Sequence, residues 1–506
     1  MRVCAVAERR LSPADAAWLY SEWENNNQTV SAVAWTETSV DPDEFRKIVR
    51  QRIVDTFPTF SRRLRSSRNP VYLPSWEDDP NFEIDNHLEI IQLPSPGSKD
   101  QLKALISEQR GQLLDRNRPL WKIYQFQNYE GGATAFHCRI QHSIADGWAL
   151  VRVVLSLADD DDQLERPETY SKQGHRKRDR VRNAITPAVD SISSLGDRMR
   201  RVPAMVSGSE IAEETLTVDL DRSRFAEFGS DLADQVASGW DQVTRQAQSA
   251  TDVFSTAVGG VKAVADFALP TLPGSTILQG DVSSSKLVDW IDPIPLEPIK
   301  QAGKSVDATI NDVLLAALTN ALRKYLDQHD DLSVADLLTS VPVSLRPADA
   351  DLPKELGNRF GLIPVLLPVG IADPIEQLVE VKRRLDELKV SQLPIVSFGL
   401  ISATALTTPE VERTIHKINQ MHAIGVTTNV PGPRHPISIG GAKVRGMWGM
   451  GGLSGNMNLS FGIFTLDGQL NFAVHSDANI TPNPELITQL FVESLNELVQ
   501  LSGVAG

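Results

Sequence analysis

Between residues 11 and 158, apolar residues recur at helical spacing in some segments and alternate with polar residues in others. Helical spacing marks three stretches, residues 43–57, 98–115 and 149–157. Ser12 followed by Pro13 has the residue types of a helix start, a capping hydroxyl and a proline in the first turn. The run from Ala135 to Ile140 alternates and predicts a strand. The pattern therefore predicts an α/β fold.

The same mixture returns after residue 276. The strongest helical pattern runs from Ala308 to Leu326, and a charged, exposed helix is predicted over residues 374–390. Strands are predicted at residues 338–343, 361–369, 422–430 and 457–475.

Residues 159–275 have a different composition, which is typical of a linker. An acidic run at residues 159–162 precedes a basic run at residues 175–182, and serine, alanine, glycine and valine dominate afterwards. Apolar residues from Phe254 to Ala268 follow helical spacing and predict an amphipathic helix. This helix would pack either on the protein's own surface or on a lipid interface, with the basic run against anionic headgroups.

Length and composition narrow the class of protein. A chain of 506 residues exceeds what one hydrophobic core usually supports. We therefore expect an N-terminal domain, a variable crossover linker and a C-terminal domain, over residues 1–158, 159–275 and 276–506. The net charge of −15 argues against a nucleic-acid partner.

The cysteines and the hydropathy bear on location. Only Cys4 and Cys138 are present, which favours a reducing, cytoplasmic compartment, and Cys138 falls in the apolar register of its strand, as a buried thiol would. No uncharged apolar stretch approaches the ~18 residues that a membrane-spanning helix needs. We therefore expect at most peripheral contact with a membrane or with lipid inclusions.

The segment from Gln141 to Gly147 carries the most informative chemistry. It reads Gln-His-Ser-Ile-Ala-Asp-Gly and follows the strand that ends near Ile140. A histidine at a strand end can keep one ring nitrogen free as a general base, Asp146 can fix the loop, and Gly147 lets the backbone turn sharply. The alternative is a buried histidine that only caps a turn.

Other common chemistries lack their signatures. Ser454 is followed by Gly455 and Asn456, so the pattern of a nucleophile elbow is incomplete. No phosphate-binding loop, dinucleotide fingerprint or His-Glu-x-x-His zinc helix is present, and His416 and His422 are six positions apart, a poor spacing for two ligands on one helix face. We therefore expect no metal site.

Six further segments, in a fixed order, carry a resemblance to one family. They are Leu11–Tyr20, Arg118–Trp121, Ala308–Leu314, Val341–Arg346, Gly357–Gly361 and Thr428–Pro433. Together with the His142 motif, this set resembles the bifunctional wax ester synthase/diacylglycerol acyltransferases over nearly the whole chain, except residues 160–275. The resemblance implies two chloramphenicol-acetyltransferase-like α/β domains that form a central tunnel. Acyl-CoA, a co-substrate rather than a cofactor, would reach the histidine from one mouth and the acceptor from the other.

One position departs from the family pattern. The family usually has two adjacent histidines, and here the first is replaced by Gln141, while the second, which is the catalytic one in the family, is retained as His142. Glutamine cannot titrate, but it can donate and accept hydrogen bonds.

The chemistry of such a reaction suggests roles for several residues. His142 would take the proton of an alcohol that attacks the acyl thioester. Asn311, beside Asp312 at the start of the long helix, would donate to the developing oxyanion, or it is an ordinary helix-capping residue. Asp146 would orient His142, or, as the resemblance favours, point away and pair with Arg346 to hold the loop.

Seven residues are candidates for the tunnel wall, although plain core packing explains them equally well. They are Pro119, Leu120, Trp121, Asn429, Pro431, Gly432 and Pro433. We predict an O-acyltransferase that acts on a long-chain alcohol, diacylglycerol or both. The alternatives are an amide-forming condensation enzyme and a lipid-binding protein without catalytic activity.

Overall fold

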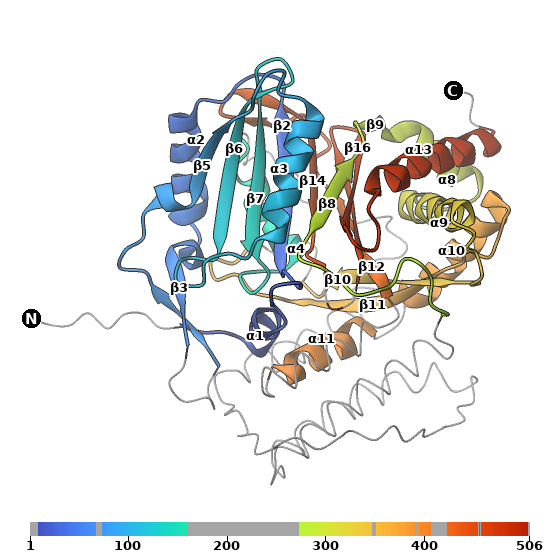
Figure 1. The fold of residues 1–506 in the computed structure, drawn as a ribbon, viewed down its shortest axis with the longest axis horizontal. Coiled ribbons are helices and arrows are strands. Elements are labelled where there is room, and N and C mark those ends of the chain that lie inside the picture. The colour runs from blue at the N-terminus through green and yellow to red at the C-terminus, as the bar shows by residue number, and fades with distance from the viewer. Residues whose placement is uncertain are drawn as a thin grey trace, which may run out of the picture.

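The computed structural model describes residues 9–66, 73–159, 273–346, 351–389, 393–405, 423–453, 455 and 457–503. Most of the predicted linker, including the amphipathic helix around Phe254, lies outside these residues. The described residues form two lobes side by side, each a β-sheet with helices against it (Figure 1). The predicted α/β fold with two lobes is confirmed.

A six-stranded sheet forms the N-terminal lobe, in the order β13-β14-β2-β7-β6-β5. Its strands are β2 (Thr29–Thr36), β5 (Leu88–Gln92), β6 (Trp121–Tyr129), β7 (Ala133–Gln141), β13 (Ser438–Ile439) and β14 (Ala442–Met450). Every residue of β7 is buried, because helices cover both faces of the sheet. Helix α3 (Lys99–Gly111) packs on the face of Val33, and α2 (Pro42–Val49) and α4 (Gly147–Leu155) pack on the face of Cys138.

The C-terminal lobe contains a seven-stranded sheet, in the order β11-β10-β12-β15-β16-β8, with β9 also paired to β16. The strands are β8 (Lys286–Trp290), β9 (Ile294–Pro295), β10 (Leu337–Ser344), β11 (Phe360–Leu367), β12 (Ala423–Pro431), β15 (Leu459–Leu466) and β16 (Gln469–Asp477). Four helices gather beside this sheet, α8 (Leu296–Ser305), α9 (Ile310–Gln328), α10 (Pro374–Lys389) and α13 (Pro484–Leu501) (Figure 1). Their apolar faces and the sheet share one hydrophobic core.

Smaller elements complete the described chain. A three-stranded sheet joins β1 (Arg9–Arg10), β3 (Arg62–Arg65) and β4 (Ser75–Asp78). Single turns of π-helix and 3-10 helix cover Arg50–Val54, Pro58–Ser61 and Ile84–Asn86. Helix α1 (Pro13–Tyr20) begins at the predicted cap, since Ser12 Oγ accepts a hydrogen bond from the backbone N–H of Asp15, and it contacts α11 (Leu393–Thr404) of the other lobe.

The predicted domain boundary is wrong at one place. Strand β14 comes late in the sequence, yet it pairs antiparallel with β2, with Met450 opposite Ser31, and so completes the N-terminal sheet. Residues 276–506 are therefore not one spatial unit. Gly446 permits this crossing, because a Cβ atom there would lie 2.2 Å from the indole ring of Trp35. Hydrophobic spacing predicts a strand, but it does not say which sheet the strand joins.

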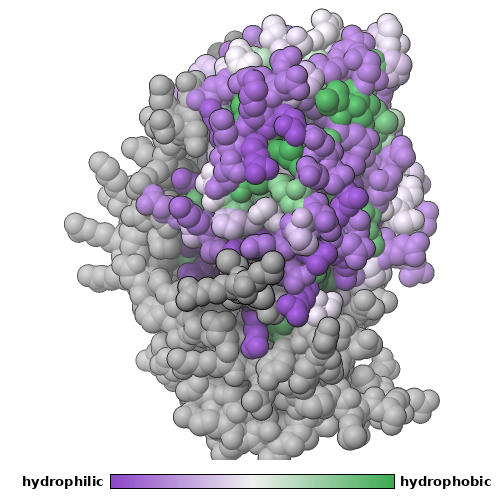
Figure 2. Space-filling view, turned by 90° about the vertical axis from the view of Figure 1, so that its left-hand side faces the viewer, coloured by the Kyte–Doolittle hydropathy of each residue, from purple (hydrophilic) through white to green (hydrophobic). Residues whose placement is uncertain are grey.

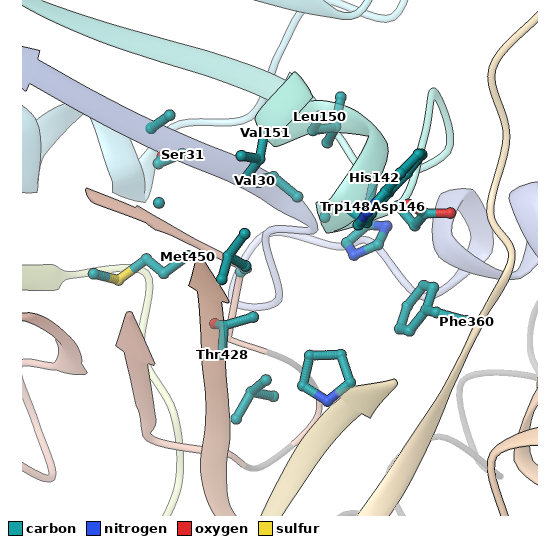
Figure 3. A pocket seen from close by; sticks show the side chains of 18 of the residues that line it. Val30, Ser31, His142, Asp146, Trp148, Leu150, Val151, Phe360, Thr428 and Met450 are labelled. Atoms are coloured by element: carbon teal, nitrogen blue, oxygen red, sulfur yellow. The ribbon is translucent and has the colours of Figure 1, made fainter. Parts of the chain in front are cut away.

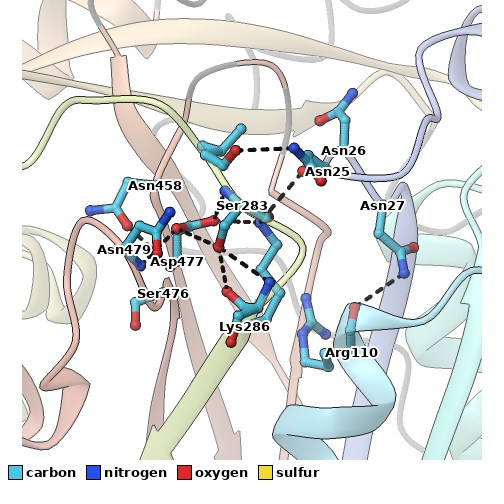
Figure 4. A network of polar contacts seen from close by, with 12 residues as sticks. Asn25, Asn26, Asn27, Arg110, Ser283, Lys286, Asn458, Ser476, Asp477 and Asn479 are labelled. Atoms are coloured by element: carbon cyan, nitrogen blue, oxygen red, sulfur yellow. Dashed lines mark hydrogen bonds and ion pairs between the residues drawn. The ribbon is translucent and has the colours of Figure 1, made fainter.

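A network of charged and polar side chains around Lys286 and Arg110 joins the two lobes (Figure 4). The buried Lys286 donates to Asp477 Oδ2 at 2.7 Å and to the carbonyl of Ser283 at 2.6 Å. Arg110, at the end of α3, donates to the carbonyl of Gly451 at 2.9 Å and to Nδ1 of His475 at 2.6 Å. The network fixes the end of α3 against β8 and β16.

The described surface gives little sign of an apolar docking face. The side of the N-terminal lobe shown in Figure 2 is mostly hydrophilic, with isolated hydrophobic residues. The large apolar side chains that are exposed lie far apart in the sequence, at Ile90, Leu113, Ile277, Val379 and Leu501. Among the described residues, no helix has both the length and the hydropathy to cross a bilayer.

Candidate active site

His142 follows the last residue of β7, and its backbone is fixed on both sides. Its N–H donates to the carbonyl of Gln28 at 2.9 Å. Its carbonyl accepts a hydrogen bond from Nδ2 of Asn358 at 2.7 Å. Gln28 belongs to the N-terminal lobe and Asn358 precedes β11 of the C-terminal lobe, so both lobes hold the histidine.

The imidazole of His142 lies between two aromatic rings. The ring of Trp18 stacks on it at 4.3 Å between centroids, with an angle of 17° between the planes. The ring of Phe360 lies 5.3 Å away at 26°. Nδ1 is 2.9 Å from Oδ1 of Asn358, and Nε2 has no hydrogen-bond partner among the described residues. The ring is therefore held in position while one nitrogen is left for chemistry.

The surroundings of His142 favour its neutral form. Burial lowers the pKa of His142, while its own backbone carbonyl, the charge of Asp146 and the hydrogen bond to Asn358 oppose that shift. A histidine whose pKa lies below 6.5 is unprotonated at neutral pH. The imidazole can therefore accept a proton without first having to lose one.

Asp146 does not bond to the imidazole. Its Oδ1 accepts from the N–H of Ala149 at 2.9 Å and caps α4. Its Oδ2 accepts from Nε of Arg346 at 3.2 Å and from the N–H of Arg359 at 2.9 Å. The predicted pairing with Arg346 is confirmed, and the alternative, in which Asp146 orients His142, is wrong because both carboxylate oxygens are engaged elsewhere.

Of two neighbours of His142, Gly147 differs from what the motif suggested, and Gln141 donates and accepts hydrogen bonds as predicted. Gly147 begins α4 without a left-handed backbone, and a Cβ atom there would meet no heavy atom within 4 Å, so the predicted need for a sharp turn is wrong. Gly147 instead borders the cavity beside His142. Gln141 points away from that cavity: its Oε1 accepts from the N–H of Ser143 at 2.6 Å, and its Nε2 donates to the carbonyl of Trp18 at 3.3 Å.

Asn311 is not the capping residue of its helix. The cap of α9 is Thr309, and Asp312 completes a capping box with it, so Asn311 is not the capping residue. Asn311 does not itself line the cavity beside His142, so its donation to an oxyanion stays a prediction. Its Oδ1 accepts a hydrogen bond from Nδ2 of Asn429 at 2.8 Å, and Asn429 does line the cavity.

The cavity lies between the lobes and has a volume of about 200 Å³. His142 and Phe360 lie toward one side of it in Figure 3, with Ser31 and Met450 toward the other. Its walls are mostly apolar and come from β2, β7 and α4 on one side and from β10, β11 and β12 on the other. A space of this kind suits a hydrocarbon chain.

Only two of the seven predicted wall residues line this cavity, Asn429 and Pro431. Leu120 and Trp121 are fully buried in the core of the N-terminal lobe, where the indole N–H of Trp121 donates to the carbonyl of Phe60 at 2.8 Å. Pro119 is buried beside them. Gly432 and Pro433 follow β12 outside the cavity wall. The core-packing alternative is correct for the segment at 119–121.

Four important neighbours of His142 were not predicted as site residues. They are Asp15, Trp18, Asn358 and Phe360. All four fall inside two segments that carry the family resemblance, Leu11–Tyr20 and Gly357–Gly361. Asp15 could also have been noticed from the sequence, because it is a carboxylate among alanines and aromatic residues on a short helix. Burying a carboxylate there is costly unless it has hydrogen-bond partners.

Comparison with known proteins identifies the family. The model of the wax ester synthase/diacylglycerol acyltransferase catalytic domain matches residues 11–314, and the model of the corresponding C-terminal domain matches residues 356–499. A probable diacylglycerol O-acyltransferase of Mycobacterium tuberculosis is 25% identical over 500 residues, which are 97% of this chain and 96% of that protein. An O-acyltransferase of Acinetobacter baylyi is 27% identical over 378 residues, 74% of this chain and 72% of that one.

Solved structures agree on the fold. The wax ester synthase/diacylglycerol acyltransferase of Marinobacter aquaeolei has a TM-score of 0.63 at 18% identity, covering 98% of this chain and 100% of that chain. The first condensation domain of the calcium-dependent antibiotic synthetase reaches 0.54 at 14% identity, with 98% and 97% covered. This chain therefore belongs to the wax ester synthase/diacylglycerol acyltransferase family and is an acyltransferase.

Proposed function

We propose that the protein transfers a long-chain fatty acyl group from acyl-CoA to the hydroxyl of a long-chain alcohol, of diacylglycerol or of both, with His142 as general base. The observation that carries this proposal is a neutral imidazole, fixed by both lobes, that opens onto an apolar cavity between them. The names of the relatives supply the acyl acceptors, wax alcohols and diacylglycerol.

The reaction balances with one imidazole. Nε2 of His142 removes the hydroxyl proton while the alcohol oxygen attacks the thioester carbonyl carbon. The tetrahedral intermediate then expels the CoA thiolate, which receives the proton from the imidazolium and leaves as the thiol. General base catalysis of this kind contributes about 10²- to 10⁴-fold. Holding both reactants in one apolar cavity supplies further acceleration.

No acyl-enzyme is needed, because a thiolate leaves readily. Cys138 is the thiol that borders the cavity, and burial raises its pKa to about 12, so almost none of it is the nucleophilic thiolate at neutral pH. Direct attack by the alcohol is the simpler route.

We further propose a cytoplasmic protein that touches a membrane or a lipid inclusion only peripherally, because its acyl acceptors are lipids. Flotation with triolein emulsions and co-sedimentation with phosphatidylglycerol vesicles test this. Recovery of all the protein in the lipid-free aqueous phase of both mixtures would contradict it.

The test of the reaction offers three acceptors to the same enzyme. Palmitoyl-CoA is mixed with hexadecanol, dioleoylglycerol or hexadecylamine, free CoA thiol is measured, and the products are separated by thin-layer chromatography. We expect thiol release and an ester with at least one of the two alcohols. Product with the amine alone would favour a condensation enzyme, and no product with any acceptor would favour a lipid-binding protein.

A further inference from the structure

Asn358 stands between the catalytic histidine and a buried carboxylate. Its side-chain amide contacts His142 twice, through Oδ1 to Nδ1 at 2.9 Å and through Nδ2 to the carbonyl at 2.7 Å. Nδ2 also donates to Oδ1 of Asp15 at 2.9 Å, and the backbone N–H of Asn358 donates to the same oxygen at 2.7 Å. Asp15 and Asn358 are both buried, so solvent does not compete for these contacts.

These contacts allow only one orientation of the amide. Two acceptors, the carbonyl of His142 and the carboxylate of Asp15, face the Nδ2 position, and both need a donor. A flipped amide would place its oxygen against two other oxygens. The oxygen of Asn358 must therefore face the imidazole, and because an amide oxygen only accepts, Nδ1 of His142 must carry the proton.

We propose that Asn358, anchored by Asp15, is the positioning residue that keeps the proton of neutral His142 on Nδ1 and leaves the lone pair on Nε2. This inference rests on the proposed role of His142 as base. Asn358 does not act on the substrate itself. Its effect on the reaction passes through the ring that it holds, as does that of a residue that fixes the tautomer in a hydrolase.

The hydrogen bond between the imidazole and Asn358 also becomes stronger as the reaction proceeds. When Nε2 takes the proton of the alcohol, the ring becomes a cation and the Nδ1–H donates from a charged group to the amide oxygen. Asp15 accepts two hydrogen bonds from Asn358 directly behind that amide; burial raises the pKa of Asp15, and the hydrogen bonds of Ser12 and Asn358 oppose that shift. Asn358 and Asp15 thus favour the imidazolium of the transition state. A carboxylate in direct contact with the ring would also raise the pKa of the resting His142, and here none is in contact.

The two residues come from different lobes. Asp15 lies on α1 beside the N-terminal sheet, and Asn358 precedes β11 of the C-terminal sheet. The correct tautomer therefore depends on how the lobes are docked. Asn358 adds a requirement that the His-x-x-x-Asp-Gly motif alone does not contain.

The direct test reads the tautomer without using activity. The full-length protein is labelled with ¹⁵N-histidine, its ring-nitrogen signals are recorded near pH 8, and the signals of His142 are assigned from their loss in His142→Gln. We expect a protonated Nδ1 in the wild type and a mixture of tautomers in Asn358→Ala and Asp15→Ala. A wild-type ring protonated on Nε2 would overturn the proposal, whether or not the acyltransferase assay succeeds.

The kinetic test separates positioning from folding. In Asn358→Ala we expect kcat to fall on the order of 10- to 100-fold, the effect of one charge-assisted hydrogen bond, with KM nearly unchanged. Asn458→Ala is the matched control, because Asn458 is an equally buried amide that donates to Thr481 at 2.6 Å and does not line the cavity. It should lower the melting temperature and leave kcat and the tautomer of His142 intact.

Two outcomes would refute the kinetic claim. One is a folded Asn358→Ala enzyme with wild-type kcat, and the other is an equal loss of kcat in Asn458→Ala, which would mark a general effect of removing a buried amide. If Asn358→Ala does not fold, Asp15→Ala gives the same comparison, because it removes the acceptor that anchors Asn358 and keeps the amide of Asn358. If the wild type shows no acyl transfer, the proposed function fails, while the tautomer measurement still decides this inference.

Discussion

His142 and His475 are both buried at the interface between the lobes, and they differ in what occupies their lone pair. Burial lowers the pKa of both, and for His475 the charges of Arg110 and Lys286 lower it further. Nδ1 of His475 must accept the hydrogen bond of Arg110, because a guanidinium only donates. The lone pair of His142 faces a cavity instead. A lowered pKa therefore does not identify a base, whereas an unoccupied lone pair with room for a substrate does.

The largest difference in activity is expected between the His142→Ala and His475→Ala variants. His142→Ala removes the base and should lower kcat/KM by about 10²- to 10⁴-fold, because general base catalysis is lost. His475→Ala should leave kcat/KM of the folded enzyme nearly unchanged. Thiol release from palmitoyl-CoA measures both, and similar losses in the two variants would remove the distinction between them.

The salt bridge beside His475 should matter for folding and not for catalysis. Asp477→Ala leaves the buried ammonium of Lys286 without its partner, which should cost about 3–5 kcal/mol of unfolding free energy. Urea denaturation measures this. Replacing both partners by Lys286→Met and Asp477→Leu removes the uncompensated charge, so the double variant should recover much of the loss. No recovery would mean that the network contributes through hydrogen bonds and not through charge balance.

Activity and stability should be lost over different ranges of pH. Activity needs neutral His142, and burial lowers its pKa, so the acid limb of kcat/KM should lie at lower pH than an ordinary histidine would give. Stability should begin to fall as pH drops below 6.5, because the unfolded state binds protons that the buried histidines resist.

His475→Gln sharpens this comparison, because it keeps an acceptor for Arg110 and does not titrate. It should reduce the slope of unfolding free energy against pH and leave the activity profile in place. A shift of the acid limb of kcat/KM in this variant would show that the two imidazoles are coupled.

The smallest effect is expected where the sequence departs from its family. Gln141→His restores the usual pair of histidines, but the side chain of residue 141 contacts Trp18 and Ser143 and not the cavity. We expect only a modest change of kcat/KM with hexadecanol as acceptor. A large gain would mean that the first histidine of the family pair, at position 141, contributes to the reaction.

Local signals in the sequence were sufficient for most helices and strands. The cap at Ser12, the long helix from Ile310 and the strand before His142 appear close to where spacing predicted them. The helix predicted over residues 98–115 ends at Gly111, and the stretch at 457–475 is a hairpin of two strands. Such boundaries depend on turns and on tertiary contacts that hydrophobic spacing does not record.

The site was predictable only in part, because its contacts join residues far apart in the chain. The motif indicated His142 as the base. The resemblance indicated that Asp146 pairs with Arg346, and the 3.2 Å contact between Asp146 Oδ2 and Arg346 Nε confirms this. It could not indicate that Asn358 would face the imidazole, since the two are 216 positions apart. Trp121 shows the converse error, because an aromatic residue in a family motif can serve the core alone.

The crossing of β14 into the N-terminal sheet has a consequence for synthesis on the ribosome. Until Met450 has emerged, β2 has no neighbour on that side, and it exposes a strand edge that invites pairing with other chains. Contacts between residues more than 400 positions apart also form slowly. The N-terminal half should therefore depend on chaperones while it waits, and expressing it without the later strand should yield aggregates in place of a folded half-enzyme.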